Sequence, residues 1–230
     1  MSGRPSHPLD RPVWSALTSR QADLAEGDGR AWRLEPHHGP FAAAADASPA
    51  SLEALAALIP VGGTVWTVEV DPLPIPRGTT VINQAQCHQM VATEIVPSSP
   101  DFAIVPLVED DAPDMLALAT LTAPGPFLHH THRLGAFVGV KQEGRLVAMA
   151  GERMRLDGFT EVSGVCTHPD FRGRGYAGGL MNAVARGIIA RGDAAFLHVY
   201  VTNTGAIALY EALGFRIRAT VTATVLARSG

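Results

Sequence analysis

The stretch of sequence that decides the fold is EVSGVCTHPDFRGRGYAGGLM, residues 161–181. It begins with a β-branched, apolar run that ends near Thr167 and is typical of a strand. A glycine-rich segment follows at 172–179, and apolar residues then recur at helical spacing as far as Ile188. Glycines let a backbone approach a ligand closely, and the first amides of a helix have no partner inside the helix. Strand, loop and helix N-terminus together therefore predict an anion-binding site.

The bulk properties narrow the class of protein. A chain of 230 residues forms one large domain or two small ones. The net charge of −4 shows no excess of basic residues of the kind that binds nucleic acid, so no nucleic-acid partner is expected. No apolar run approaches the ~20 residues of a membrane span, so no membrane partner is expected either. Two cysteines, Cys87 and Cys166, make no disulfide framework, which favours a reducing compartment and a cytoplasmic location.

The first hundred residues show a weaker pattern than the rest. Residues 97–100 (PSSP) are the best candidate linker, so we expect an N-terminal extension or half-domain at 1–100 and a second domain at 101–230. Segment 81–95 is ambiguous between a helix and a pair of strands. The remaining expectations are helices at 13–24 and 49–58, irregular structure at 36–50, and a strand at 64–70.

Beyond residue 100 the pattern sharpens. Three strands joined by tight turns, which we expect to be antiparallel, are predicted at 136–140, 145–154 and 160–167. A strand at 102–107 and a helix at 109–121 precede them. The glycine-rich loop leads into a helix at 175–191, and the chain continues with a strand at 195–201, a helix at 203–213 and one or two closing strands at 215–226.

One interpretation of the loop is a dinucleotide fingerprint, because Gly173, Gly175 and Gly178 spell G-x-G-x-x-G and Asp193 lies 20 residues after the first glycine. Three observations argue against it. Residues 168–172 separate the strand from the first glycine, Asp193 precedes the next strand instead of ending it, and only one βαβ-like unit is evident. A P-loop is also excluded, since no Gly-Lys-Ser/Thr ends the loop.

In a second frame the loop spells Arg172-x-x-Gly175-x-Ala177. Here the sequence resembles the GNAT superfamily of acyl-CoA-dependent N-acetyltransferases, whose motif is Arg/Gln-x-x-Gly-x-Gly/Ala. A second signature of that family is matched downstream by Asn203-x-x-Ala206-x-x-Leu209-Tyr210-x-x-Leu213-Gly214-Phe215. The resemblance covers roughly 101–228 and implies an α+β fold, a three-layer α/β arrangement with a mixed, mainly antiparallel sheet flanked by helices.

The resemblance also implies a cosubstrate, acetyl-CoA. The family's pyrophosphate-binding loop corresponds to Arg172, Gly173, Arg174, Gly175, Tyr176 and Ala177. Pantetheine would enter a gap between the fourth and fifth strands, beside Val165, Cys166 and Thr167, with Gly164 as the bulge that opens it. A strand amide near Val165 would polarise the thioester carbonyl. Asn203 and Ala206 are the remaining implied cofactor contacts, and Asn203 also suits a helix N-cap.

The implied catalytic residues are Tyr210 and Glu161. Tyr210 would protonate the departing thiolate, although its position also suits ordinary packing of a helix on the sheet. Glu161, at the start of the fourth strand, is the expected base for the amine, and Glu152 is its rival. We interpret His198 as a core-edge histidine and Cys166 as a packing residue.

The sequence therefore predicts an N-acetyltransferase that transfers acetyl directly to a primary amine of a small molecule or peptide. The alternative is a non-catalytic acyl-CoA-binding or regulatory module on the same fold. A homodimer is compatible with either. No metal is expected, because His129, His130 and His132 lack a cysteine or carboxylate partner at convincing spacing, and Arg133 is interpreted as a surface charge.

Overall fold

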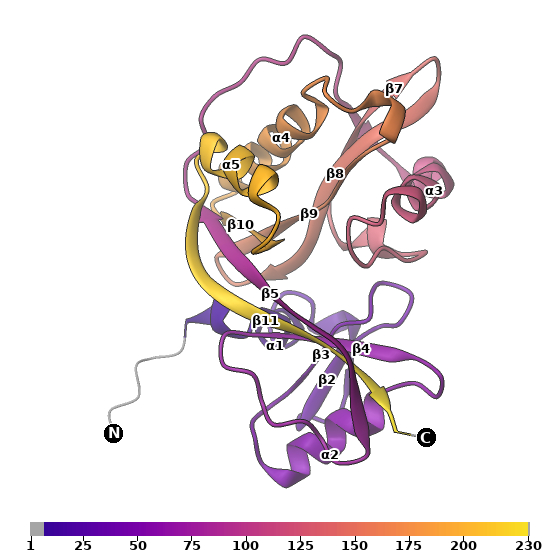
Figure 1. Cartoon of the computed structure of the whole chain (residues 1–230), viewed down its shortest axis with the longest axis vertical. Coiled ribbons are helices and arrows are strands. Elements are labelled where there is room, and N and C mark those ends of the chain that lie inside the picture. The colour runs from indigo at the N-terminus through magenta and orange to yellow at the C-terminus, as the bar shows by residue number, and fades with distance from the viewer. Residues whose placement is uncertain (1–6, 230) are drawn as a thin grey trace.

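The computed structural model describes residues 7–229 (Figure 1). Its centre is an eight-stranded sheet in the order β4-β11-β5-β10-β9-β8-β7-β6. β9 and β10 pair in parallel, and the other neighbouring strands pair antiparallel, which confirms the mixed, mainly antiparallel sheet. The strands are β4 Thr64–Glu69, β5 Thr79–Ala92, β6 Val105–Leu107, β7 Phe137–Gln142, β8 Arg145–Leu156, β9 Phe159–Thr167, β10 Ala194–Tyr200 and β11 Arg216–Arg228.

Helices cover both faces of the sheet, as the three-layer arrangement requires. α4 (Tyr176–Ala190) and α5 (Thr204–Leu213) lie on one face and α3 (Ala112–Thr122) on the other (Figure 1). Successive residues of a strand point to opposite faces, so Ala148 and Ala150 pack in the cluster that includes α4, whereas Met149 packs against α3. Both faces of β8 are thus buried. No helix among residues 7–229 is long and apolar enough to span a membrane.

The N-terminal part builds a second, three-stranded sheet in the order β1-β2-β3 (Ala25–Gly27, Ala31–Leu34 and Ala42–Ala44). β3 falls where irregular structure was expected. Its three alanines are fully buried, with Ala43 in the cluster of α1 (Pro12–Leu17) and its two neighbours in the cluster of α2 (Pro49–Leu58). Side chains this small let elements pack on both faces of the strand. The bounds predicted for α2 are confirmed, and Ser48 caps it by accepting a hydrogen bond from the amide of Ser51.

Two other expectations for the N-terminal part were wrong in part. The helix predicted at 13–24 ends at Leu17 and is followed by a short 3-10 turn, Ala22–Leu24. The chain turns because buried Gln21 binds the backbone of β8, donating to the carbonyl of Arg153 and accepting from the amide of Arg155. Segment 81–95 is mostly one strand, β5, instead of a helix or a strand pair.

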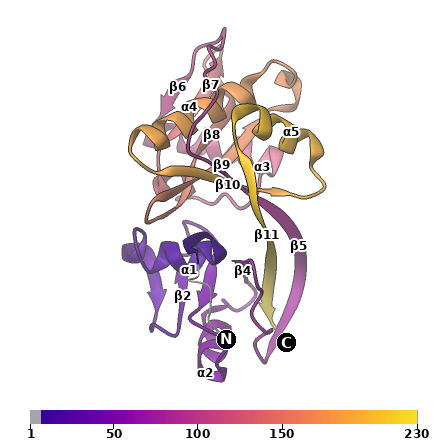
Figure 2. The same ribbon diagram turned by 90° about the vertical axis from the view of Figure 1, so that its left-hand side faces the viewer.

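β5 and β11 run side by side along the molecule from the region of α5 to that of α2 (Figures 1 and 2). β5 lies between β11 and β10, so residues before 100 contribute to the same sheet as residues after it. Phe196 of β10 also shares a core cluster with Leu9 and Val13. The division of the chain at residue 100 stays a prediction.

Candidate active site

The neighbouring strands β9 and β10 separate part-way along their length. Their pairing runs only from Ala194 opposite Phe159 to Phe196 opposite Glu161, although β9 continues to Thr167 and β10 to Tyr200. β9 also bulges against β8, where its register shifts between Ser163 and Cys166. Gly164 lies in this bulge with φ +64°, a conformation that favours glycine. The bulge expected at Gly164 is therefore confirmed. Past Glu161 and Phe196, the edges with which β9 and β10 face each other are no longer paired.

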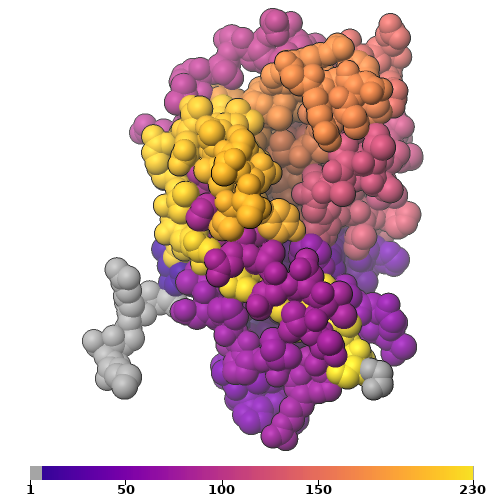
Figure 3. Space-filling view, in the orientation of Figure 1, coloured from indigo at the N-terminus to yellow at the C-terminus, as the bar shows by residue number. Residues whose placement is uncertain are grey.

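A cavity of about 430 Å³ lies beside this gap and extends to the glycine-rich loop. Figure 3 shows this face of the molecule hollowed between the gold atoms of the α5 region and the pink atoms near residue 120. Every residue predicted to bind the cofactor lies on its wall, as does Tyr210. The predicted residues are Val165, Cys166, Thr167, Arg172, Gly173, Arg174, Gly175, Tyr176, Ala177, Asn203 and Ala206. Sequence reasoning missed the five other wall residues, which are Thr122, Pro124, Phe171, Gly178 and Leu209.

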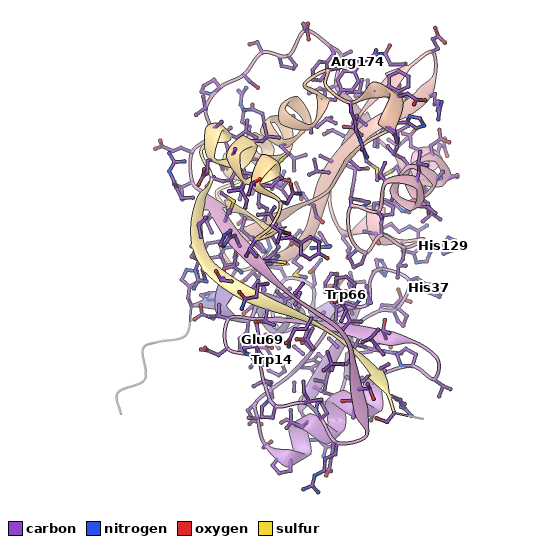
Figure 4. All side chains as sticks on the ribbon, viewed as in Figure 1. Trp14, His37, Trp66, Glu69, His129 and Arg174 are labelled. Carbon is purple, nitrogen blue, oxygen red and sulfur yellow. The ribbon has the colours of Figure 1, made fainter. Side chains whose placement is uncertain are left out.

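The glycine-rich loop forms one end of this cavity. Gly173 and Gly175 have φ of +77° and +75°, and a Cβ on either would meet no atom within 4 Å, so the backbone is open to the cavity side. Gly175 is the N-cap of α4 and supplies no side-chain cap, which leaves the first helical amides available to an anion. Arg174, labelled in Figure 4, stacks over Phe171 at 4.9 Å from the ring centroid and adds positive charge here.

A second cavity, of about 360 Å³, adjoins the first. The two share wall residues Thr122, Pro124, Val165, Asn203 and Tyr210. Most of the other residues on the wall of the second cavity have apolar side chains, among them Phe41, Trp66 (Figure 4), Val68 and Cys87, while Arg153 adds a guanidinium and His198 an imidazole. Four of these residues precede residue 100. Trp66 and Val68 of β4 and Cys87 of β5 reach the site because these strands join the sheet beside β11, and Phe41 reaches it through its bridge to Trp66. No local sequence signal marks them.

Tyr210 lies at the junction of the two cavities. It comes from α5, whose N-terminus is fixed by the side chain of Asn203, which accepts a hydrogen bond of 3.2 Å from the amide of Ala206. Asn203 thus has the N-cap role foreseen for it and also faces both cavities. Burial raises the pKa of the Tyr210 phenol above its ordinary value of 10.0, so the phenol carries its proton at neutral pH.

Glu161 lies behind the second cavity and not on its wall. Its carboxylate is fully buried, receives two hydrogen bonds of 2.8 Å from Arg153, and lies 2.8 Å from Nδ1 of His198. Burial alone would raise the pKa of Glu161, but the charge of Arg153 and the hydrogen bonds from His198 and Arg153 lower it to about 2. A carboxylate held this way is a weak proton acceptor. Its role as the base stays a prediction, and direct contact with an acceptor in either cavity is not available to it.

His198 is fixed between Glu161 and Gln89. Oε1 of Gln89 accepts a hydrogen bond from Arg218, so its Nε2 is the amide donor and faces Nε2 of His198 at 3.1 Å. His198 must then accept at Nε2 and donate from Nδ1 to Glu161, which defines a neutral imidazole. Sequence reasoning assigned His198 to the core edge, whereas it contributes to the wall of the second cavity.

The rival base, Glu152, is buried and pairs with Arg191 at 2.5 Å. It lines neither cavity. Cys166 does reach the first cavity, but burial raises the pKa of its thiol to about 11, so it is neutral and suits the packing role predicted for it. Arg133 pairs with Glu109, away from both cavities.

Comparison with known proteins decides the family. A family model described as FR47-like protein matches residues 137–225. A crystal structure of a protein assigned to the GNAT family of acetyltransferases, from Novosphingobium aromaticivorans, is 49% identical to this chain. The match covers 98% of this chain and 100% of that one, with a TM-score of 0.92. The chain belongs to the GNAT family.

More distant members share the fold of this GNAT protein. A GCN5-related N-acetyltransferase from Kribbella flavida matches with 19% identity and a TM-score of 0.63, covering 100% of this chain and 97% of that one. A GCN5-related N-acetyltransferase-like protein from Streptococcus suis matches with 13% identity and a TM-score of 0.60, over 94% and 92%. No curated protein sequence matches the chain. The family identity supports an acyltransferase that uses acetyl-CoA, as the GNAT family does.

Proposed function

We propose that this protein is an N-acetyltransferase that transfers the acetyl group of acetyl-CoA directly to the primary amine of a small molecule or peptide. The observation that carries the proposal is the pair of cavities that meet at Val165 and Tyr210. One cavity suits a cofactor with an anionic end at the glycine-rich loop. The other suits an acceptor. Their junction is the place where a thioester and an amine would meet.

In the proposed mechanism the pyrophosphate binds the amides of residues 173–177 and the charges of Arg172 and Arg174. The pantetheine arm pairs with the open edge of β9 near Val165, whose N–H polarises the thioester carbonyl. The amine nitrogen attacks the carbonyl carbon, and the tetrahedral intermediate collapses with cleavage of the C–S bond. Tyr210 donates its phenolic proton to the departing thiolate, and the proton that the nitrogen loses as the amide forms restores the phenol.

The attacking amine must be neutral, and we propose that Glu161 assists its deprotonation through His198. His198 lines the acceptor cavity as a neutral imidazole, and the Glu161 carboxylate beside Nδ1 would stabilise the imidazolium that proton uptake creates. Proton uptake at Nε2 requires the Gln89 amide to move aside, since that N–H occupies the lone pair. In this scheme Glu161 is a positioning residue for His198.

The acceptor cavity also favours one class of amine. Arg153 donates to Glu161 through Nε and Nη2, whereas its Nη1 makes no hydrogen bond with the described residues and faces Gly125 on the cavity wall. Its guanidinium also lies 4.8 Å from the ring centroid of Phe41. A carboxylate is the natural partner of a guanidinium edge. We therefore propose an acceptor with an apolar or aromatic body and a carboxylate group.

The test is a thiol-release assay with acetyl-CoA over matched acceptors, in which each amino acid is compared with its amide or decarboxylated amine. We expect turnover with an apolar amino acid and at least a tenfold lower kcat/KM for its partner without the carboxylate. Calorimetry with acetyl-CoA runs in parallel. Tight binding without turnover on any amine would favour the non-catalytic module. Equal rates for the matched pair would contradict the proposal that the acceptor carries a carboxylate.

A further inference from the structure

Five of the nine histidines of the chain lie in two short segments, HH at 37–38 and HHTH at 129–132. The fold brings these segments together, and Figure 4 shows His37 and His129 on the same side of the molecule. The amide of His130 donates to the carbonyl of His37 at 2.9 Å. The hydroxyl of Thr131 donates to the carbonyl of His38 at 2.7 Å. Both bonds fix the backbone around the imidazoles.

Three side chains converge where the segments meet. One ligand atom each of Glu35, His38 and His130 lies within 4.8 Å of the other two. Nδ1 of His38 is 2.5 Å from Oε2 of Glu35, and the rings of His38 and His130 have centroids 5.3 Å apart. All three residues are partly buried. A carboxylate from the N-terminal half thus completes a histidine pair whose members come from different segments.

We propose that Glu35, His38 and His130 bind a divalent transition-metal ion of the Zn²⁺ type. Imidazole nitrogens with one carboxylate suit Zn²⁺ and its neighbours in the series, while Mg²⁺ and Ca²⁺ require oxygen ligands. Bonds of ~2.0–2.2 Å place ligand atoms about 3.3 Å apart in a tetrahedral shell. The set reaches that spacing by small side-chain rotations in which the Glu35–His38 contact opens. His37, whose ring centroid is 5.3 Å from that of His130, or a water supplies the fourth ligand.

The backbone around the site is already ordered, so little conformational entropy is lost on binding. The amide of Glu35 donates to the carbonyl of Leu24 at 2.8 Å, and the amide of His38 donates to the carbonyl of Glu35 at 2.9 Å. Arg133, three residues after His130, is paired with Glu109, which also contacts His132. Neither His132 nor Arg133 therefore competes for the Glu35 carboxylate.

A metal here would connect two parts of the chain that are remote in sequence. Glu35 and His38 follow β2 in the N-terminal sheet, and His130 lies beyond α3, in the connection whose earlier residues 123–126 line the acceptor cavity. Binding would hold this connection against the N-terminal part. The ion would be structural in this role, and acetyl transfer would not require it to contact either substrate.

The experiment is titration calorimetry with ZnCl₂ on the full chain, produced without a polyhistidine tag and treated with chelator. We expect one Zn²⁺ per chain and no heat with MgCl₂. His38→Ala, His130→Ala and Glu35→Gln should each weaken binding by at least about tenfold, as loss of even a supporting partner of a ligand does. The matched control is His129→Ala, because His129 adjoins the site in sequence but lies outside the set of ligand atoms.

Thermal melts provide an independent measurement, because a ligand that binds only the folded state raises Tm. At one Zn²⁺ concentration, the Tm of the wild type and of His129→Ala should rise by more than that of Glu35→Gln, a substitution that keeps the shape of the side chain. The proposal is overturned by an absence of binding in the micromolar range. It is equally overturned by binding that all three ligand variants retain, which would mark adventitious coordination elsewhere. Neither outcome depends on acetyltransferase activity.

Discussion

Tyr210 is a phenol at the junction of two cavities, and its environment keeps it protonated. Tyr210→Phe removes the hydroxyl and leaves the ring that packs 6.4 Å from Phe215. Loss of a general acid lowers kcat by about 10²–10⁴-fold. We expect a fall in that range with acetyl-CoA affinity unchanged within about twofold, measured by steady-state kinetics and calorimetry. An unchanged kcat would remove Tyr210 as the acid.

The same residue predicts the alkaline side of the pH profile. Because burial raises the pKa of Tyr210 above 10.0, the acid form persists as the pH rises through the range in which an ordinary tyrosine ionises. We expect kcat at saturating acceptor to show no falling limb below about pH 10. A falling limb in the wild type near pH 8 would assign the proton donor to another group.

The ion pair between Arg153 and Glu161 is a buried pair, with side-chain exposures of 12% and 1%. Arg153→Ala leaves the Glu161 carboxylate buried without its cation, and breaking a buried pair in this way costs about 3–5 kcal/mol. Urea unfolding at pH 7 should show that loss. Adding Glu161→Gln to the same chain should recover part of the lost free energy of unfolding, because the buried unpaired charge is then absent. If nothing is recovered, the loss comes from the packing of the Arg153 side chain.

The pH dependence of stability has a defined sign for Glu161. Its pKa is about 2 in the folded chain and 4.5 as an ordinary carboxyl, so the folded state binds the proton more weakly than the unfolded state. The stabilisation is present above about pH 4.5 and is lost as the pH falls towards 2. Urea midpoints from pH 6 to pH 2.5 should fall more steeply in the wild type than in Glu161→Gln. Parallel curves would contradict the assignment.

Among the elements, the glycine-rich loop can be tested with a matched control. Gly175→Val forces a β-branched residue to φ +75° beside the cavity, and Gly144→Val imposes the same strain at φ +81° in the β7–β8 turn. Both should lose a similar amount of stability in urea. Only Gly175→Val should abolish acetyl-CoA binding by calorimetry. Equal affinity in the two variants would argue against the loop as the phosphate site.

The elements that sequence predicted well are those with local signals. α2 follows a serine cap and ends before a proline–glycine turn, and α4 and α5 carry both the apolar spacing and the motif residues. β5 gave no clear signal because its exposed half carries polar residues that also suit a helix. Its strand conformation is set by partners on both sides, β10 and β11, and those pairings are remote in sequence.

The residues of the candidate site also divide into those that the sequence predicts and those that it does not. The cofactor residues lie on one continuous motif and its downstream signature, so their positions could be read from the sequence. Trp66 and Arg153 of the acceptor cavity come from β4 and β8, which are far apart in the sequence, and Phe41 joins them through its bridge to Trp66. Glu161 was expected as the base for the amine, and no pattern in the sequence indicates that Arg153 and His198 enclose it.

At the scale of the whole molecule, β11 and β10 depend on residues before 100. β11 pairs with β4 and β5 and with no other strand of the described chain, and β10 pairs with β5 from Ala195 opposite Ala92 to Tyr200 opposite Cys87. A fragment of residues 101–230 lacks both β4 and β5. Phe196 and Val221, both fully buried in the intact protein, would then lose the N-terminal part of their core cluster.

We therefore expect the 101–230 fragment not to fold alone, although the family motifs all lie within it. Removing β4 and β5 takes away every backbone partner of β11 and leaves a long apolar edge on β10, which favours aggregation. Urea unfolding followed by circular dichroism should show no cooperative transition for the fragment, against a single transition for the full chain. Adding residues 1–100 in trans should restore it if the strands can still pair. A cooperative transition in the isolated fragment would instead make residue 100 a true domain boundary.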